Sequence, residues 1–338
     1  MLRLALVAGI AACSFGSPPD PVPAIDDPDA PPAMPSMIQW LGDLHVRSNG
    51  YAVPPTQVLA GQPVDVCVRT YPMGAAANAT LAIGGRELAM RVDADGVGPY
   101  GHDTRWCAAL DAADLVAGRP LALRAIAADA AGAPVEAVLD VTPRAELALL
   151  DEPALWRMAG PGSFARDGDL VRAQPADGLG LYWAAIPTPA DFELAIDWQL
   201  DRSDDNSGVF VRFRDPDGFG YDNPAWVGVH DGLEIQIDDT ARPDGADIHR
   251  TGAVYEQPGT YTRPADRPPG TWRQFVIRVT GARVAVALDG QPVSDVTFAG
   301  DPAHPQRALP SVPGAPRFVG LQTHSGAVAF RRVLLRAL

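Results

Sequence analysis

The sequence contains the stretch Leu233-Glu234-Ile235-Gln236-Ile237-Asp238, in which an apolar side chain alternates with a polar one at every step. Successive side chains of a β-strand point to opposite faces of the sheet, so this pattern predicts a strand. The three apolar side chains are expected to face a core. The three polar ones are expected to share the other face, either as a binding surface or as an ordinary solvated face.

Two further stretches alternate in the same way, and both predict strands. In residues 206–214 one face is predicted to carry Asn206, Gly208, Phe210, Arg212 and Arg214. In residues 318–324 one face is predicted to carry Gly320, Gln322 and His324. If the three strands are neighbours in one sheet, their polar side chains share a single surface.

The composition favours short strands over long helices. The chain has 338 residues, of which 33 are Gly and 34 are Pro, and such frequent breakers suit strands joined by turns. A length above about 250–300 residues predicts two domains. The formal net charge of -14 would repel phosphate backbones, so no nucleic-acid partner is expected. Beyond the N-terminus, no stretch reaches the roughly 18 apolar residues of a membrane span.

The first residues have features of a bacterial export signal. Arg3 supplies a positive charge, residues 4–10 are apolar, and two alanines precede Cys13. Small residues before a cysteine resemble a lipoprotein signal, so residues 1–13 are predicted to be a signal with Cys13 as the lipidated anchor. The apolar run is short for a signal core, which leaves open a non-lipidated signal or an incidental cysteine. Residues 14–36, rich in Pro, Asp and Ala, are predicted to be a disordered tether.

Residues 37–144 are predicted to form a first β-sandwich. Short apolar runs separated by turn residues recur at 64–68, 79–83, 87–92, 121–127 and 135–141. This spacing is typical of an immunoglobulin-like sandwich. In an exported chain, Cys67 and Cys107 form an even pair once the anchor candidate is set aside. We expect a disulfide between them, joining strands close to Trp106, with two buried free thiols as the alternative.

From about residue 149 a series of motifs follows in a fixed order to the end of the chain. They are Leu149-Leu150-Asp151, Leu155-Trp156, Asp167-Gly168-Asp169-Leu170, the strand-like stretch 191–200, Asn206-Ser207-Gly208-Val209-Phe210-Val211-Arg212, the stretch 233–238, Thr251-Gly252-Ala253-Val254-Tyr255, Arg267-Pro268-Pro269-Gly270-Thr271-Trp272 and Gly320-Leu321-Gln322-Thr323-His324. No single motif is specific, but their order resembles the 3-keto-disaccharide hydrolase family.

The resemblance implies a concanavalin-like jelly roll over residues 149–338, in which the three alternating strands are neighbours. The whole chain is therefore expected to be all-β, with an N-terminal immunoglobulin-like sandwich followed by a concanavalin-like jelly-roll sandwich. Two positions depart from the family pattern, because Arg273 and Asp239 stand where the family commonly has Asn. These departures weaken any inference about a particular substrate.

The resemblance also implies a reaction. A ketone at C3 of a sugar makes the C2 proton acidic; a base removes it, the enolate expels the group at C1, and water adds to the unsaturated sugar. Such a site needs a base, an enolate stabiliser and a proton donor. The catalytic candidates are His324 or Glu234 as the base and Arg212 as the stabiliser, with base and acid left unassigned.

A conventional pair of glycosidase carboxylates is not expected on the central strand. Glu234 and Asp238 are separated by four residues, which is about 13 Å along a strand, whereas a retaining pair needs about 5–5.5 Å. Gln236, between them, can serve neither as a nucleophile nor as a proton donor. The elimination reaction avoids the need for such a pair.

The remaining candidates are predicted to bind substrate. They are Gln236, Tyr255, Gln322, Asn206, Tyr221 and Trp226. Tyr221 and Trp226 are expected in a loop over residues 215–231, where aromatic rings can form the rim of a sugar pocket, and Tyr255 could instead be the acid. A divalent metal ion held by Glu234 and His324 could stabilise the enolate, although their spacing carries no metal signature. No other cofactor is indicated.

These features predict an exported hydrolase or lyase of the bacterial cell envelope that cleaves 3-keto-glycosides. Its partner would be a carbohydrate, and it would contact the membrane only through the lipid anchor. The alternatives are a non-catalytic carbohydrate-binding surface lipoprotein and a structural surface lipoprotein. Convergence of Arg212, Glu234 and His324 in one pocket would favour the enzyme, whereas their separation would favour the binding module.

Overall fold

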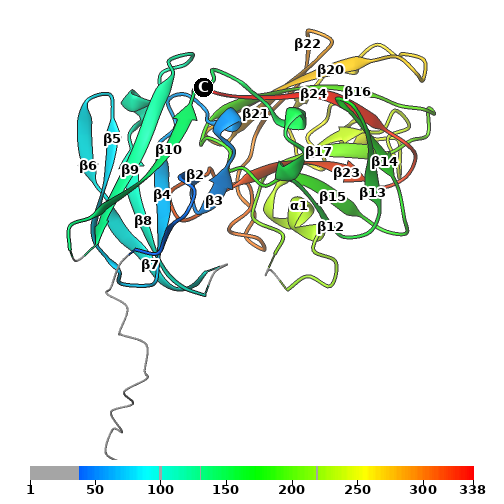
Figure 1. Cartoon of the computed structure of the whole chain (residues 1–338). Helices are drawn as coiled ribbons and strands as arrows, with labels where there is room; N and C mark the ends of the chain where they lie inside the picture. Colours follow the sequence, from blue (N-terminus) through cyan, green and yellow to red (C-terminus); the bar gives the residue numbers. More distant parts are fainter. Residues whose placement is uncertain (1–37, 99–100, 130, 218–219) are drawn as a thin grey trace, which may run out of the picture. The chain divides into compact units, whose positions relative to one another are not determined.

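The computed structural model describes residues 38–98, 101–129, 131–217 and 220–338. The predicted signal, the Cys13 anchor and the tether lie outside these residues. Within them the chain is almost entirely β (Figure 1), as its alternating stretches predicted. None of the described helices is long and apolar enough to span a membrane.

Residues 40–141 form two antiparallel sheets. One has the order β3-β2-β4-β8-β7, with β1 paired to β4. Its strands are β1 (Trp40–Leu41), β2 (His45–Ser48), β3 (Tyr51–Val53), β4 (Val64–Tyr71), β7 (Arg91–Gly98) and β8 (Gly101–Leu110). The other has the order β10-β9-β5-β6. Its strands are β5 (Ala76–Ile83), β6 (Arg86–Ala89), β9 (Leu121–Asp129) and β10 (Pro134–Val141). The 3-10 helices η1 (Pro55–Gln57) and η2 (Ala112–Asp114) lie between these strands.

The apolar run at 87–92 is not the single strand that its pattern predicted. The chain leaves strand geometry at Met90, which separates β6 from β7, and the two strands belong to different sheets. Met90 is buried in the core to which both sheets contribute. An apolar run can therefore continue through a corner between layers, because the corner faces the same core. The immunoglobulin-like connectivity of these sheets stays a prediction.

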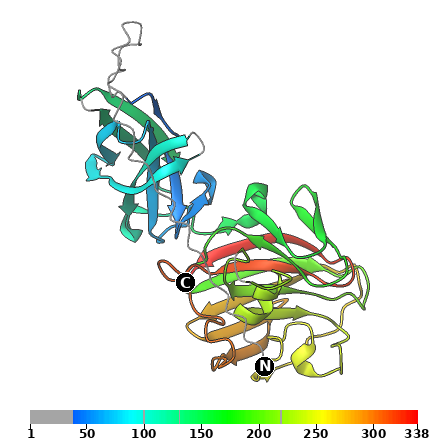
Figure 2. The same ribbon diagram turned by 90° about the horizontal axis from the view of Figure 1, so that it is seen from below.

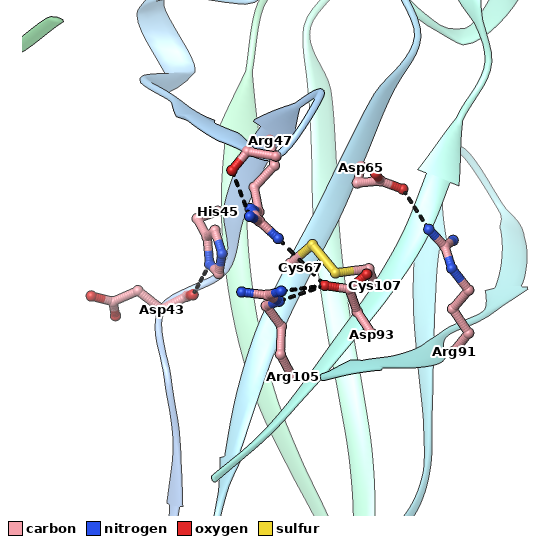
Figure 3. Close-up of a disulfide and its surroundings, with 10 residues drawn as sticks. Asp43, His45, Arg47, Asp65, Cys67, Arg91, Asp93, Arg105 and Cys107 are labelled. Carbon is pink, nitrogen blue, oxygen red and sulfur yellow. Dashed lines mark hydrogen bonds and ion pairs between the residues drawn. A yellow bond between two sulfur atoms is a disulfide. The ribbon is translucent and has the colours of Figure 1, made fainter. Parts of the chain in front are cut away.

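The predicted disulfide between Cys67 and Cys107 is confirmed (Figure 3). The two residues lie directly opposite each other on the neighbouring strands β4 and β8, with their Cα atoms 4.1 Å apart. The bond thus joins two strands of one sheet, whereas the immunoglobulin disulfide joins two sheets. Both cysteines are buried, and close to them Arg105 Nε donates a hydrogen bond of 2.7 Å to Asp93 (Figure 3).

Residues 147–337 form two further sheets. The larger has nine strands, in the order β13-β14-β24-β16-β20-β21-β22-β19 with β11 paired to β24. Its strands are β11 (Leu147–Ala148), β13 (Ser163–Asp167), β14 (Leu170–Gln174), β16 (Phe192–Gln199), β19 (Thr260–Tyr261), β20 (Arg273–Thr280), β21 (Arg283–Leu288), β22 (Gln291–Thr297) and β24 (Ala329–Ala337). The smaller has the order β12-β15-β23-β17-β18. Its strands are β12 (Trp156–Ala159), β15 (Gly180–Ala184), β17 (Ser207–Phe213), β18 (Leu233–Ile237) and β23 (Phe318–Thr323).

These two sheets are the layers of the jelly-roll sandwich (Figure 1 and Figure 2). The apolar side chains of β18 and of its neighbours β17 and β23 face the main core, as the alternation predicted. The opposite face of the five-stranded sheet carries a second apolar cluster around Trp183 and Phe210, to which Ala225 and Val227 contribute. The helix α1 (Trp226–Asp231) therefore covers part of this outer face. The 3-10 helices η3 (Leu149–Asp151), η4 (Pro153–Leu155) and η5 (Asp247–His249) complete the chain.

Candidate functional site

The candidate site is centred on Glu234, in β18 on the outer face of the five-stranded sheet. β17 lies between β18 and β23, with Gly208 opposite Gln236 and Phe210 opposite Glu234. Because Gly208 has no side chain, the Glu234 side chain can lie across β17. A Cβ atom at position 208 would come within 2.2 Å of Glu234 Oε1.

On the far side of Gly208, Gln322 Nε2 donates a hydrogen bond of 2.7 Å to Glu234 Oε1. Glu234, Gln236 and Gln322 are thus brought together on one face, as the three alternating strands predicted. All three are buried, with exposed fractions of 8%, 3% and 5%. The face is therefore not an ordinary solvated strand surface, and polar groups held in such a place usually serve a site or a network.

The environment of Glu234 favours the protonated carboxyl. Burial is the main cause and raises its pKa to about 8, against an ordinary value of 4.5. The hydrogen bond from Gln322 acts in the opposite direction, and the negative charge of Glu256 raises the pKa further. Most molecules therefore carry a neutral, proton-donating Glu234 at pH 7.

This raised pKa predicts how stability depends on pH. Below about pH 4.5 the carboxyl is protonated in both the folded and the unfolded chain, and its stabilising effect is complete. As the pH rises towards 8, the unfolded chain ionises freely while the folded chain must keep the proton or bury a charge. The free energy of unfolding of wild type should therefore fall by about 3–5 kcal/mol relative to Glu234→Gln between pH 4.5 and 8.5. Guanidinium unfolding of both proteins across this range tests it, and parallel stability curves would contradict it.

Tyr255 lies beside Glu234 at the free edge of β18. Residues 252–255 pair with this edge through three backbone hydrogen bonds: Gln236 N–H to Ala253 O (2.9 Å), Gly252 N–H to Gln236 O (2.8 Å) and Tyr255 N–H to Glu234 O (2.8 Å). The Tyr255 ring is half-buried. Burial, followed by the charges of Glu256 and Glu234, raises the pKa of its phenol.

The segment that connects β18 to this edge contributes residues that sequence reasoning missed. The His249 side chain is 8% exposed, and its Nδ1 lies 2.7 Å from Asp244 Oδ1. Its Nε2 lies 3.9 Å from Glu256 Oε1, and its ring centre is 5.0 Å from that of Tyr255. The only sequence signal was proximity to the Thr251–Tyr255 motif, since no local spacing links Asp244 to His249.

The fully buried carboxylate of Asp238 holds this segment in place. It accepts hydrogen bonds from the backbone N–H groups of Thr240 (2.8 Å) and Ala241 (3.1 Å), and from Arg242 Nε (3.0 Å). Asp238 alternates with Glu234 and Gln236, but its role in the structure is to stabilise a turn.

His324 and Asn206 lie at the strand ends next to this turn. The backbones of Asn206 and Ser325 exchange two hydrogen bonds (2.7 and 3.1 Å), which places His324 beside the start of β17. His324 keeps an exposed side chain. Desolvation of its ring and the positive charge of Arg242 lower its pKa. Among the described residues, no side chain forms a hydrogen bond with it.

The structure does not bring Arg212 to this group. The pairing of β17 with β23 shifts between Val211 and Phe213, and Arg212 has a φ of 58°. The guanidinium is buried and donates hydrogen bonds to the carbonyl oxygens of Ala190 and Gly281. The predicted alternation assumed an unbroken strand, and this β-bulge turns Arg212 away from the face that carries Glu234.

Tyr221 and Trp226 belong to a separate group of rings. Trp226 is the first residue of α1, not part of a loop as predicted, and is 43% exposed. Its ring stacks on His230 with centroids 5.5 Å apart, and His230 stacks in turn on His304 at 4.7 Å. Tyr221 also contacts His230, at 5.3 Å. Trp226 is the exposed member of this group, and the other three rings are half-buried.

The residues of the site do not suit the metal ion considered above. In residues 38–98, 101–129, 131–217 and 220–338, no group of three or more His, Cys, Asp and Glu side chains is placed to hold a metal ion. Glu234, one of the two suggested ligands, favours a proton at pH 7 and already accepts a hydrogen bond from Gln322. No step of the chemistry below is assigned to a metal.

The fold of residues 149–336 is a jelly-roll sandwich, and a family match places these residues in the class of carbohydrate-active, glycosyl hydrolase-like domains. These residues match a family model described as a 3-keto-alpha-glucoside-1,2-lyase-like domain. Because the match covers more than half of the chain, the protein belongs to this family. Among curated proteins, none matches the chain.

Solved structures with some similarity include two putative glycosyl hydrolases from Parabacteroides distasonis. One is 16% identical with a TM-score of 0.46, covering 57% of this chain and 94% of its own. The other is 23% identical with a TM-score of 0.39, covering 54% and 99%. A carbohydrate-binding module from Bacillus subtilis is 17% identical with a TM-score of 0.35, covering 54% and 96%.

Proposed function

We propose that the jelly-roll domain cleaves 3-keto-glycosides by elimination across C1 and C2 followed by hydration. The observation that carries this proposal is the buried carboxyl of Glu234, fixed by the hydrogen bond from Gln322. Burial raises its pKa to about 8, which favours the protonated form at neutral pH. A group that is neutral at working pH and fixed in one orientation is suited to give a proton to a departing oxygen.

Gln322 sets the orientation of this acid. Its amide N–H donates to Glu234 Oε1, which leaves Oε2 to carry the carboxyl proton. In the proposed reaction a base takes the C2 proton of the keto sugar and a double bond forms between C1 and C2. The bond from C1 to the glycosidic oxygen breaks, and Oε2 gives its proton to that oxygen. Water then adds its oxygen to C1 and a proton returns to C2.

The requirement for a ketone gives the first functional prediction. Only a ketone at C3 makes the C2 proton acidic, so 3-keto-disaccharides should be cleaved at least about 100-fold faster than the same disaccharides without the ketone. Chromatography of the released sugars, with the full chain and matched substrate pairs, measures this ratio. Equal rates on both members of a pair would rule out elimination.

Carbohydrate binding without turnover is the second candidate function. Two observations favour it. Arg212 does not converge with Glu234 and His324. The exposed ring of Trp226, which stacks on His230, offers a flat apolar face of the kind on which sugars stack. Saturable binding of 3-keto-disaccharides without any cleavage would favour this candidate over the enzyme. Export to the cell envelope through a lipidated Cys13 remains part of either proposal.

A further inference from the structure

The proposed reaction needs a base, and the structure offers a second imidazole, that of His249, which is held by a carboxylate. His249 lies at the end of η5, in the segment that connects β18 to the paired residues 252–255. Both of its ring nitrogens face carboxylates, with Asp244 at 2.7 Å from Nδ1 and Glu256 at 3.9 Å from Nε2. A ring held in this way is oriented before substrate arrives.

Asp244 determines which nitrogen of His249 carries the proton. A hydrogen bond from the backbone N–H of Ala246, followed by the contact with His249, lowers the pKa of Asp244, so its carboxylate is ionised and can only accept. The short contact is then a donation from Nδ1–H, so in the neutral ring the lone pair lies on Nε2, 3.9 Å from Glu256 Oε1. A carboxylate that fixes the tautomer of an imidazole is the arrangement by which hydrolases prepare a histidine base.

The other groups around His249 connect it to Glu234, the proposed general acid. The Tyr255 ring packs against His249, and the Tyr255 backbone is bonded to Glu234. Glu256, which faces Nε2, also raises the pKa of Glu234. The next residue, Arg250, donates hydrogen bonds from its guanidinium to the carbonyl oxygens of Asp239 (2.6 Å) and Gly245 (3.3 Å), and its Nε lies 3.8 Å from Asp247 Oδ1 in η5. His249 and Glu234 therefore belong to one polar group at the edge of β18.

We propose that His249, oriented by Asp244, is the general base that removes the C2 proton of a 3-keto sugar. This assignment rests on the proposed function. Nε2 takes the proton from C2 while Glu234 gives its own to the leaving oxygen, so the pair becomes imidazolium and carboxylate. When water adds, the carboxylate takes a proton as the oxygen of water bonds to C1. The imidazolium returns a proton to C2, and both residues regain their starting state.

The test compares three variants and one control variant of the full chain on a 3-keto-disaccharide, each assayed for kcat and KM from pH 5 to 9. His249→Asn keeps a donor towards Asp244 but has no base at the position of Nε2, so kcat should fall about 100-fold or more with little change in KM. Added imidazole should restore part of the rate. A control outside the site is His102→Asn, at an exposed histidine of β8, which should keep kcat within about threefold. His324→Asn tests the competing base and should keep the acidic limb of the wild-type profile of kcat against pH.

Asp244→Asn separates a chemical role from a structural one. Removing the anion makes the protonated imidazole less favourable, so the acidic limb of the kcat profile should move to lower pH while kcat falls about tenfold or more. A loop that merely needs His249 for packing would not show this shift. The Asp244→Asn profile also decides the question if His249→Asn fails to fold.

Two outcomes would overturn the assignment of His249 as the base. In the first, the acidic limb of the profile of kcat against pH is unchanged in both His249→Asn and Asp244→Asn. In the second, this limb is lost in His324→Asn alone. Failure of the proposed function would look different, because wild type itself would then leave the 3-keto-disaccharide uncleaved. In that case the assignment falls together with the function on which it rests.

Discussion

Glu234→Gln is expected to lower kcat on a 3-keto-disaccharide by about 100-fold or more at pH 7. Glutamine has nearly the shape of the protonated carboxyl and can still meet Gln322, but it cannot release a proton to the departing oxygen. The loss should therefore appear in kcat and leave KM nearly unchanged. Steady-state kinetics at saturating substrate measure it.

The wild-type pH profile offers an internal check on the same residue. A general acid must be protonated to act, so the rate should fall as the pH rises through the Glu234 pKa of about 8. Glu193→Gln is the matched control, since Glu193 is equally buried at 8% but lies in β16 of the other sheet, where Arg336 pairs with it at 2.7 Å. If Glu234→Gln retained wild-type kcat, Glu234 would not be the acid.

Alternation predicted the face of β18 correctly because this strand is unbroken and one of its faces is a core. Leu233, Ile235 and Ile237 could not leave that core without exposing their apolar surface, so Glu234 and Gln236 had to take the opposite side. The same reasoning failed for Arg212 since it counted residues through a bulge. Its positive φ depends on contacts with residues far away in the chain, which no local pattern records.

The sequence also could not predict that the polar face of β18 is buried. Burial raises the pKa of Glu234, and that burial depends on parts of the chain outside β18. Asp244 and His249 meet only because Asp238 anchors the turn that follows β18. Irregular segments have no periodicity to read, so their side chains could not be placed in advance.

The family resemblance, which rests on the order of the motifs along the chain, pointed to a segment that local patterns could not identify. The Thr251–Tyr255 motif has no regular secondary structure of its own, yet its position after β18 was expected from the family resemblance. The structure gives the physical reason, because these residues supply the hydrogen bonds that complete the free edge of β18. Such a requirement preserves an order of motifs even where each of them is short.

Gly208→Ala is expected to disable the same acid from the neighbouring strand. The new Cβ would lie 2.2 Å from Glu234 Oε1 and 2.8 Å from its Cγ, closer than non-bonded atoms can approach each other. The carboxyl must then move and lose its hydrogen bond from Gln322, which should reduce stability by about 1–3 kcal/mol. A displacement of the acid by about 1 Å should also lower kcat by about 100-fold.

A double-mutant cycle distinguishes this collision from a general effect of the substitution. In a Glu234→Ala background the space above residue 208 is vacant, so adding Gly208→Ala should cost less than about 0.5 kcal/mol. Guanidinium unfolding of wild type, the two single variants and the double variant gives the interaction energy, which should be at least about 1 kcal/mol. An equal cost in both backgrounds would mean that the Cβ meets some other group. The Glu234 side chain would then not lie across Gly208, and the orientation of the proposed acid would be wrong.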